Sequence, residues 1–155
     1  MSHPQSDVRR NAWYHSIRAH TAVMEILERE LMEQTGMSIA WYDVLVCLYK
    51  SPGHSMRMSE LADQVLMSRS WLTRRVDQLV GVGLVERCSA SGDGRGVQAK
   101  LTRQGKRAFI RLERSHGATI DDHFASLLSE DEAEVMVRAM AKIERSARNT
   151  LGLGN

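Results

Sequence analysis

The pattern of hydrophobic and polar residues between positions 59 and 102 predicts helices first and strands afterwards. Ser59 and Ser68 can each cap a helix, because a serine hydroxyl beside the first turn accepts hydrogen bonds from free backbone N–H groups. Gly81 and Gly83 are expected to end the second of these helices. In that helix the apolar residues recur every three or four positions and predict a buried face formed by Leu72, Val76, Leu79 and Val80.

The strands of this region are expected at residues 84–89 and 97–101, joined by a polar, glycine-rich hairpin tip at residues 91–96. Arg57 and Met58 are expected to add a short strand to the same small sheet. Two helices joined by a short turn and followed by a two-stranded wing form a DNA-reading unit. The pattern therefore predicts a winged helix-turn-helix at residues 57–102.

A long helix is predicted before this unit, from Asp7 to about Glu33. Its apolar residues are separated by alternating steps of four and three, a heptad spacing that is typical of an extended helix–helix seam. Because a stripe of this length is hard to bury within one small domain, residues 7–33 are expected to form a dimerisation helix. The stripe consists of Trp13, Ile17, His20, Met24, Leu27 and Leu31.

Two more helices are predicted after the wing. Thr102 is expected to cap the first, which would extend to roughly Leu128 with a bend at Gly117. Ser129 opens a capping box, Ser-Glu-Asp-Glu, at the start of the second. Residues 103–150 are therefore expected to supply further dimerisation helices. The apolar stripe of the last helix consists of Met136, Met140, Ile143 and Ala147.

Length and composition indicate a single domain, residues 1–155, of a mainly α fold with a small β wing (α+β). With 43% hydrophobic but 5% aromatic residues, the core is expected to be aliphatic and rich in methionine. The sequence has no run of about 18 apolar residues, so no membrane span is predicted. The N-terminus lacks the apolar centre of a secretory signal, and two cysteines cannot make a disulfide framework. The sequence therefore predicts a cytoplasmic protein.

Positive charge is concentrated on the predicted winged unit. Residues 57–111 carry 11 basic and 5 acidic side chains, against 5 and 6 in residues 1–56 and 5 and 8 in residues 112–155. A basic face on a helix-turn-helix is suited to a phosphate backbone. Double-stranded DNA is therefore the predicted partner.

A polar face of the helix after Ser68 carries the candidate DNA contacts. Its serine and threonine hydroxyls can hydrogen-bond to base edges or phosphates, and its arginines can reach guanine or the backbone. The alternative is an ordinary amphipathic helix whose polar face is solvated. The candidate residues are Arg69, Ser70, Thr73 and Arg74.

The chain contains LADQVLMSRSWLTRRVDQLVGVGLVER, then an Asp-x-Arg wing tip at Asp93 and Arg95, and then KLTRQGKRA. Together these segments resemble the MarR family of bacterial winged-helix transcription regulators, and the resemblance covers nearly the whole chain. The sequence departs from that family at Trp71, where a small residue is usual, and at Arg75, where an apolar residue is usual.

The resemblance implies specific roles for the wing and for a ligand. In similar proteins the wing-tip arginine enters the minor groove and the nearby aspartate holds it, which implies these roles for Arg95 and Asp93. A solvated hairpin is the alternative. The apolar stripes at both termini predict a homodimer on a pseudo-palindromic operator, and a dimer that covers a promoter favours repression, with activation as the alternative. The resemblance also implies release by a small aromatic or anionic effector. That effector would lie in a crevice between the dimerisation helices and the winged unit.

Trp71 and Arg75 are four residues apart, and therefore lie on one side of the predicted recognition helix, away from its polar face. In one interpretation Trp71 covers the stem of Arg75, which meets a phosphate. In the other the pair forms the floor of the effector crevice, with Trp71 stacking on an aromatic ring and Arg75 pairing with a carboxylate. Trp13 is a third candidate for effector binding.

Other functional classes compete with DNA binding. A redox-responsive regulator would use Cys88, which follows an arginine on a strand, whereas Cys47 lies on an apolar face. A zinc-responsive regulator would use histidines such as His116 and His123, although no tight ligand pair occurs. A dimeric interaction protein that does not bind DNA is a further alternative. No phosphate-cradling loop or nucleophile motif is present, so no enzymatic activity, cofactor or metal site is predicted.

Overall fold

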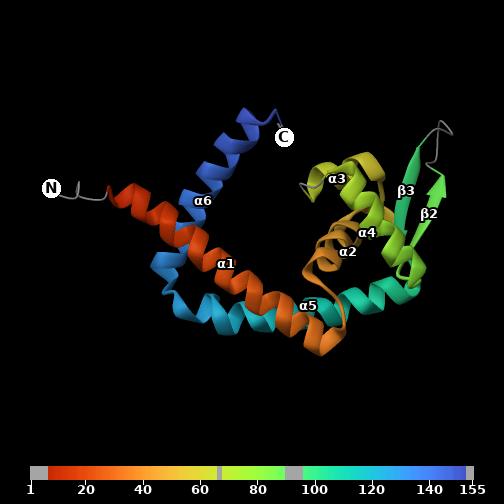
Figure 1. The fold of residues 1–155 in the computed structure, drawn as a ribbon, viewed down its shortest axis with the longest axis horizontal. Coiled ribbons are helices and arrows are strands. Elements are labelled where there is room, and N and C mark those ends of the chain that lie inside the picture. The colour runs from red at the N-terminus through yellow and green to blue at the C-terminus, as the bar shows by residue number, and fades with distance from the viewer. Residues whose placement is uncertain (1–6, 66–67, 90–95, 153–155) are drawn as a thin grey trace.

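The computed structural model describes residues 7–65, 68–89 and 96–152 of the chain (Figure 1). It confirms a mainly α fold with a small sheet, in which long helices flank a compact central unit. In chain order the elements are α1 (Val8–Thr35), α2 (Ile39–Lys50), the 3₁₀ turn η1 (Pro52–His54), β1 (Ser55–Arg57), α3 (Met58–Gln64), α4 (Arg69–Gly81), β2 (Val85–Ser89), β3 (Val97–Leu101), α5 (Arg103–His123), the 3₁₀ turn η2 (Ala125–Leu127) and α6 (Glu130–Thr150).

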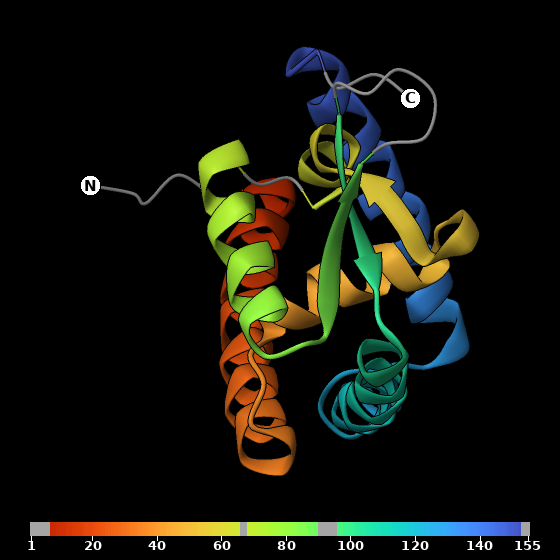
Figure 2. The ribbon, with the colours of Figure 1, turned by 90° about the vertical axis from the view of Figure 1, so that its right-hand side faces the viewer.

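The sheet is antiparallel, with the strand order β1-β3-β2. Strand β3 lies in the middle, where Ala99 is opposite both Met56 of β1 and Arg87 of β2. The expected third strand is present, but it occupies residues 55–57, and Met58 already belongs to α3. Figure 2 shows the β2–β3 ribbon extending beside α4.

The hydrophobic core surrounds α2, which packs against α4, α5 and β3. Val44, Leu45 and Leu48 of α2 have no exposed surface. Helices α3, α4 and α5 and strand β3 contribute aliphatic residues to this core, whereas Val80 of α4, expected on the buried face, is 36% exposed. These contributions include Leu61 from α3, Leu72, Val76 and Leu79 from α4, Ala99 and Leu101 from β3, and Ala108 and Leu112 from α5.

Side-chain caps define most helix starts as expected. The hydroxyl of Ser68 accepts from the Trp71 backbone, that of Thr102 from Gly105, and that of Ser129 from Glu132. Ser59 was expected to cap α3, and this was wrong: the helix begins at Met58 with Arg57 as its N-cap. Because β1 leads directly into α3, the Glu60 carboxylate accepts from the Arg57 backbone N–H at 3.4 Å, so no hydroxyl outside the helix is required.

The end of α5 also differs from the expectation. The helix ends at His123 and not near Leu128, because Phe124 leaves the helical region (φ −141°, ψ −62°). Helix α5 continues through Gly117, where a weak point or bend was expected. Side chains on both sides of that glycine bind α1: Ser115 donates to Gln34 at 2.6 Å, and Thr119 donates to Glu30 at 2.7 Å. These contacts fix this part of α5 against α1.

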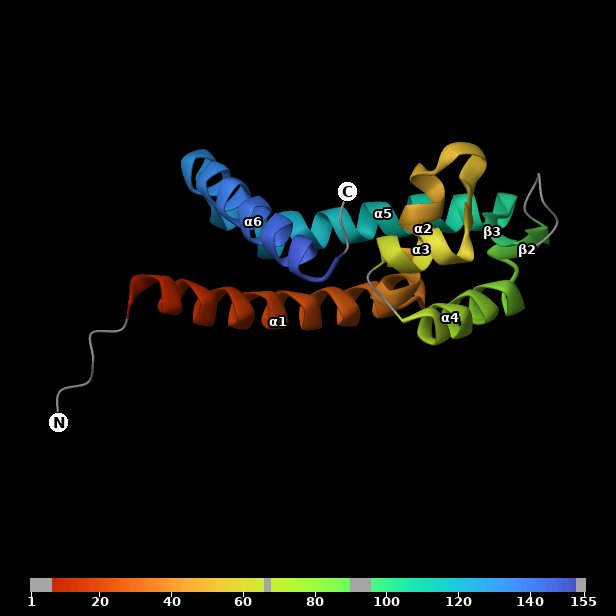
Figure 3. The ribbon, with the colours of Figure 1, turned by 90° about the horizontal axis from the view of Figure 1, so that it is seen from above.

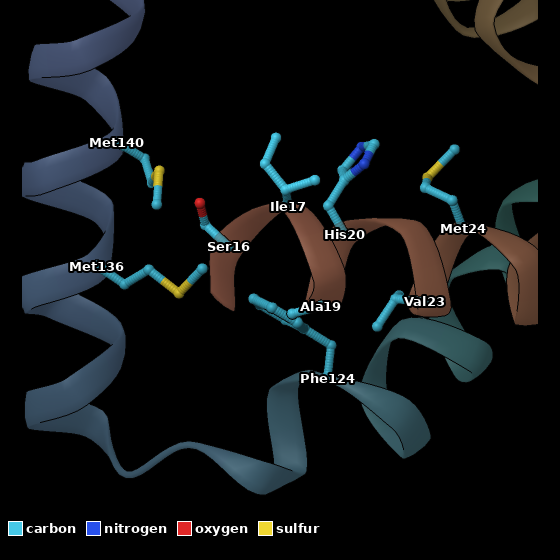
Figure 4. Close-up of a pocket in the computed structure, with 9 residues that line it drawn as sticks. All are labelled: Ser16, Ile17, Ala19, His20, Val23, Met24, Phe124, Met136 and Met140. Carbon is cyan, nitrogen blue, oxygen red and sulfur yellow. The ribbon is translucent and has the colours of Figure 1, made fainter. Parts of the chain in front are cut away.

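The N-terminal half of α1 and all of α6 are poorly covered by the rest of the chain (Figures 1 and 3). Of the α1 stripe, Leu27 and Leu31 are buried, whereas Trp13 is 66% and Ile17 47% exposed. Helix α6 has no buried residue. Figure 4 shows side chains of α1, α6 and the end of α5 around an apolar groove of about 400 Å³, the α1–α6 groove. It is lined by Ser16, Ile17, Ala19, His20, Val23, Met24, Phe124, Met136 and Met140.

A tight junction fixes α5 to the turn after α4. The hydroxyl of Thr102 donates to the carbonyl of Gly83 at 2.7 Å and accepts from the backbone N–H of Gly105 at 2.9 Å. Gly83 has φ +74°, which favours glycine. A Cβ at Gly105 would collide with the backbone carbonyl of Leu84. The first turn of α5 can therefore approach the α4–β2 turn only without a side chain at position 105.

Within the described part of the chain, no helix combines the length and the apolar character that a membrane span requires.

Candidate nucleic-acid interface

Helix α4 presents a polar, exposed face opposite its buried one. Leu72, Val76 and Leu79 are almost completely buried. The predicted contact residues all lie on the exposed side, in the N-terminal half of the helix, and this is the half that a recognition helix inserts into a major groove. They are Arg69, Ser70, Thr73 and Arg74.

The two arginines of this face make no side-chain hydrogen bond or ion pair with any residue that the structure describes. The guanidinium groups of Arg69 and Arg74 are therefore available to an outside partner. The Thr73 hydroxyl donates to the Arg69 carbonyl at 2.8 Å, which leaves its oxygen available as an acceptor. The hydroxyls of Ser68 and Ser70 lie 3.3 Å apart. The face thus combines positive charge with small hydroxyls that can read base edges or bind phosphates.

An ion pair connects α4 to the wing. The Arg87 guanidinium on β2 donates to the Asp77 carboxylate on α4 at 2.7 Å. Asp77 lies on the exposed face of α4, and its pairing fixes the base of the wing against the recognition helix. The sequence does not reveal this contact, because residues ten apart on a helix and a strand have no periodic relation that would predict it.

The structure describes the wing strands β2 and β3. The described strands end at Ser89 and begin again at Val97. Asp93 and Arg95, the predicted minor-groove residues, lie outside the described residues. The roles of Asp93 and Arg95 stay predictions.

Trp71 and Arg75 form a stacked pair on the side of α4. The Arg75 guanidinium carbon lies 4.4 Å from the centre of the Trp71 ring, and its Nη1 donates to Gln78 at 3.0 Å. The indole N–H of Trp41, on α2, donates to the same Gln78 oxygen at 3.4 Å. Trp71 and Arg75 are half-buried. Trp13 is not part of this cluster, because it lies near the N-terminal end of α1, whereas the other end of that helix adjoins α2 (Figure 3).

The sequence profile described as the MarR family matches residues 35–96, from the end of α1 to the wing. The chain is similar to the MarR family over this segment, which is less than half of its length. Its fold matches AbsC, a MarR family transcriptional regulator from Streptomyces coelicolor, with a TM-score of 0.87 and 27% identity, over 96% of this chain and 99% of that one.

Two more proteins to which this chain is similar are linked to DNA and to transcription. Sco3205, a MarR family regulator from Streptomyces coelicolor solved in complex with DNA, has a TM-score of 0.85 and 27% identity. That match covers 94% of this chain and 91% of Sco3205. A putative transcriptional regulatory protein for the hcr operon of Thauera aromatica is 26% identical over 137 residues, 88% of this chain and 81% of the relative. These similarities support a DNA-binding transcription regulator, and members of the MarR family are not enzymes.

Of the two cysteines, Cys47 is a poor candidate for redox chemistry. Burial raises the pKa of the Cys47 thiol, and the nearby Asp43 carboxylate acts in the same direction, which disfavours the reactive thiolate. Cys88 is half-buried, and its sulfur lies 3.9 Å from the carbonyl oxygen of Gln98. A redox response through Cys88 stays a prediction.

The histidines of α5 have contacts within the chain. The His116 ring stacks on Tyr42 with 4.1 Å between ring centres, and burial lowers the pKa of His116 from its ordinary 6.5. His123 Nε2 lies 3.2 Å from the Glu30 carboxylate. A hydrogen bond from Thr119 holds the pKa of Glu30 below its ordinary value, and His123 acts in the same direction. Among the described residues, no three His, Cys, Asp or Glu side chains come together to hold a metal ion.

Proposed function

We propose that this chain is a homodimeric repressor that binds a pseudo-palindromic operator in the cytoplasm and is released by a small effector. The observation that carries the proposal is the exposed face of α4, on which the side chains of Arg69 and Arg74 have no partner among the described residues. Within the described fold, no acidic group pairs with these two positive charges. A phosphate backbone and guanine edges supply the missing partners.

The exposed apolar surface supports the dimer. Isolated exposed apolar residues are common, but a contiguous stripe on two long helices is not. The α1–α6 groove, Trp13 and Ile17 would be covered by the equivalent helices of a second copy, because a two-fold interface brings the same patches together. A dimer of this kind presents two copies of α4. We expect operator half-sites about one helical turn apart, roughly 10 base pairs.

The DNA contacts are divided between the helix and the wing. In this proposal Arg69, Ser70, Thr73 and Arg74 enter the major groove, while Arg95 enters the adjacent minor groove and Asp93 holds it. Support comes from the exposure of the four helix residues and from the Arg87–Asp77 pair, which fixes the direction of the wing relative to α4. Repression follows when a dimer on a promoter excludes polymerase.

The effector site is proposed at Trp71 and Arg75. Their side chains are already stacked and half-buried, so an aromatic ring on Trp71 would place a carboxylate beside the guanidinium. The Gln78 side chain connects this pair to α2, because its oxygen accepts hydrogen bonds from both Arg75 and Trp41. A ligand that rearranged the pair would act directly on the recognition helix, and coupling of about 1–3 kcal/mol is enough to release DNA.

A mobility shift with the promoter region of the protein's own gene tests the proposal. We expect a discrete complex at low nanomolar to micromolar protein that survives an excess of unrelated duplex. A thermal-shift screen with aromatic carboxylates then identifies effectors, and these should dissolve the complex. Equal competition by unrelated duplex would refute sequence-specific regulation.

A further inference from the structure

The exposed side of the first half of α5 carries a row of arginines that the recognition helix does not explain. Arg103, Arg107 and Arg114 lie within about 40° of one another around the helix, and Arg111 within about 80° of Arg103. All four are exposed. They extend along about 16 Å of the helix axis, at about 1.5 Å per residue. We refer to these four residues as the α5 ridge.

The charge of the α5 ridge is not neutralised by the part of the chain that the structure describes. None of its arginines forms an ion pair with a described residue. Between positions 103 and 114 the sequence has one acidic residue, Glu113. It lies on another side of the helix, where its carboxylate accepts a hydrogen bond from the Tyr42 hydroxyl at 2.7 Å. The ridge therefore presents four positive charges without a described counter-charge beside them.

The positive charges of the ridge destabilise helix α5. Cations near a helix N-terminus meet the positive end of the helix dipole, and like charges four residues apart repel. The first turn of α5 contains no acidic residue, whereas that of α6 contains Glu130, Asp131 and Glu132. A surface that serves solubility alone would mix both signs, as the Arg138–Glu134 pair does on α6. An anionic partner outside the chain would offset this cost.

The ridge faces away from the DNA that α4 reads. Helix α2 packs against both α4 and α5. The ridge is opposite the buried Leu112 of α5, and the contact face of α4 is opposite its own buried residues. The ridge and the contact face of α4 are therefore separate surfaces on two different helices.

We propose that the α5 ridge is a second contact surface for double-stranded DNA, which binds the phosphates of a segment other than the one on α4. Guanidinium groups in a regular row suit a phosphate backbone, and Ile110 is the one large apolar side chain exposed among the described residues of this row. A protein partner would favour an apolar centre with aromatic residues. The two ridges of a dimer would allow one regulator to bridge two DNA segments.

A bridging assay, combined with binding of a short operator duplex, tests this proposal. One operator-free duplex of a few hundred base pairs is fixed to beads, and a second, fluorescent duplex is captured through the protein. The test variant combines Arg103→Ser, Arg107→Ser and Arg114→Ser. The matched control combines Arg138→Ser, Lys142→Ser and Arg145→Ser, which removes three exposed charges from the face of α6 opposite its apolar stripe.

We expect the wild type and the α6 control to capture the second duplex, and we expect capture by the ridge variant to fall at least fivefold. Binding of a short operator duplex, measured by fluorescence anisotropy, should change less than twofold in the ridge variant, with an unchanged circular dichroism spectrum. No capture by the wild type, or equal capture by the ridge variant, would overturn the proposal. A ridge variant whose short-duplex binding falls equally would also overturn it, since the ridge would then belong to the first interface. Capture of an acidic protein with no effect on DNA would have the same consequence.

Discussion

At the scale of single residues, the candidate DNA contacts contribute little to the fold. Arg74 is exposed and its side chain has no partner among the described residues, so its removal leaves no buried group unsatisfied. Surface substitutions of this kind usually change stability by less than about 0.5 kcal/mol. Binding and folding can therefore be separated by mutation at this helix.

Arg74→Ala and Arg95→Ala are each expected to weaken operator binding without unfolding the protein. Each removes a positive charge from the proposed interface, and the slope of log affinity against log salt should become shallower by roughly 0.9 for each phosphate that the variant no longer neutralises. Fluorescence anisotropy across a salt series gives both quantities. Unchanged affinity and slope in both variants would remove these residues from the interface.

Arg75→Ala distinguishes the two interpretations of the Trp71–Arg75 pair. If the pair binds an effector, the variant should bind operator normally and fail to release it with an anionic aromatic compound such as benzoate or a screened relative. The measurement is operator release followed against effector concentration. Weaker operator binding with a normal release would instead identify Arg75 as a phosphate contact.

At the scale of elements, the junction between α5 and the α4–β2 turn depends on Gly105. Gly105→Ala places a methyl group against the Leu84 carbonyl, and overpacking of this kind costs about 1–3 kcal/mol. Gly117→Ala is the matched control, because a Cβ there meets nothing within 4 Å and should stabilise α5 by about 0.5–1 kcal/mol. Urea denaturation measures both changes. A neutral Gly105→Ala would show that the turn can shift at little cost.

The packing of α2 on α5 should give a pH dependence. Burial lowers the pKa of His116 below its ordinary 6.5, so the unfolded state binds the proton more readily. The free energy of unfolding should therefore fall as the pH decreases from 7 to 5. The pKa of Glu30 is lowered from 4.5, so its ionised carboxylate contributes to stability throughout the range from pH 7 to 5. That stability is lost only at lower pH, as the pH falls through the folded-state pKa of Glu30.

His116→Phe should keep the stacking on Tyr42 and reduce this decrease in stability. Denaturation at pH 7 and pH 5 tests the expectation, with His15→Phe on the exposed part of α1 as the control. Parallel decreases in His116→Phe and the wild type would assign the pH dependence to other groups.

The sequence predicted those elements whose signals are local. Ser68, Thr102 and Ser129 were correct caps because a hydroxyl and the following turn define a helix start on their own. The starts and ends set by tertiary contacts were missed, as at Phe124, where the end of α5 lies against the α1–α6 groove. Likewise, periodicity identified the exposed face of α4, but the contact of Trp41 with Gln78 joins residues 37 positions apart and has no signal in the sequence.

At the scale of the whole molecule, the exposed apolar stripe of α1 and the α1–α6 groove predict assembly. Ile17→Lys places a charge in the centre of the proposed interface and should convert a dimer to a monomer at micromolar concentration. Val82→Lys at the end of α4 is the control, since both native side chains are 47% exposed and Val82 lies outside the groove. Light scattering distinguishes the two states. A monomeric wild type, or a dimeric Ile17→Lys variant, would contradict the proposed interface.

The glycine junction at the start of α5 also makes that helix a lever. Thr102 and Gly105 fix its first turn to the end of α4, while its last turns belong to the surface proposed to bind a second copy. A helix of 21 residues is about 31 Å long, so a tilt of roughly 5° at one end displaces the other by about 3 Å. Small rearrangements between two protomers would therefore change the spacing of the two recognition helices by a few ångströms. A change of this size would misalign the two recognition helices with successive major grooves of the operator.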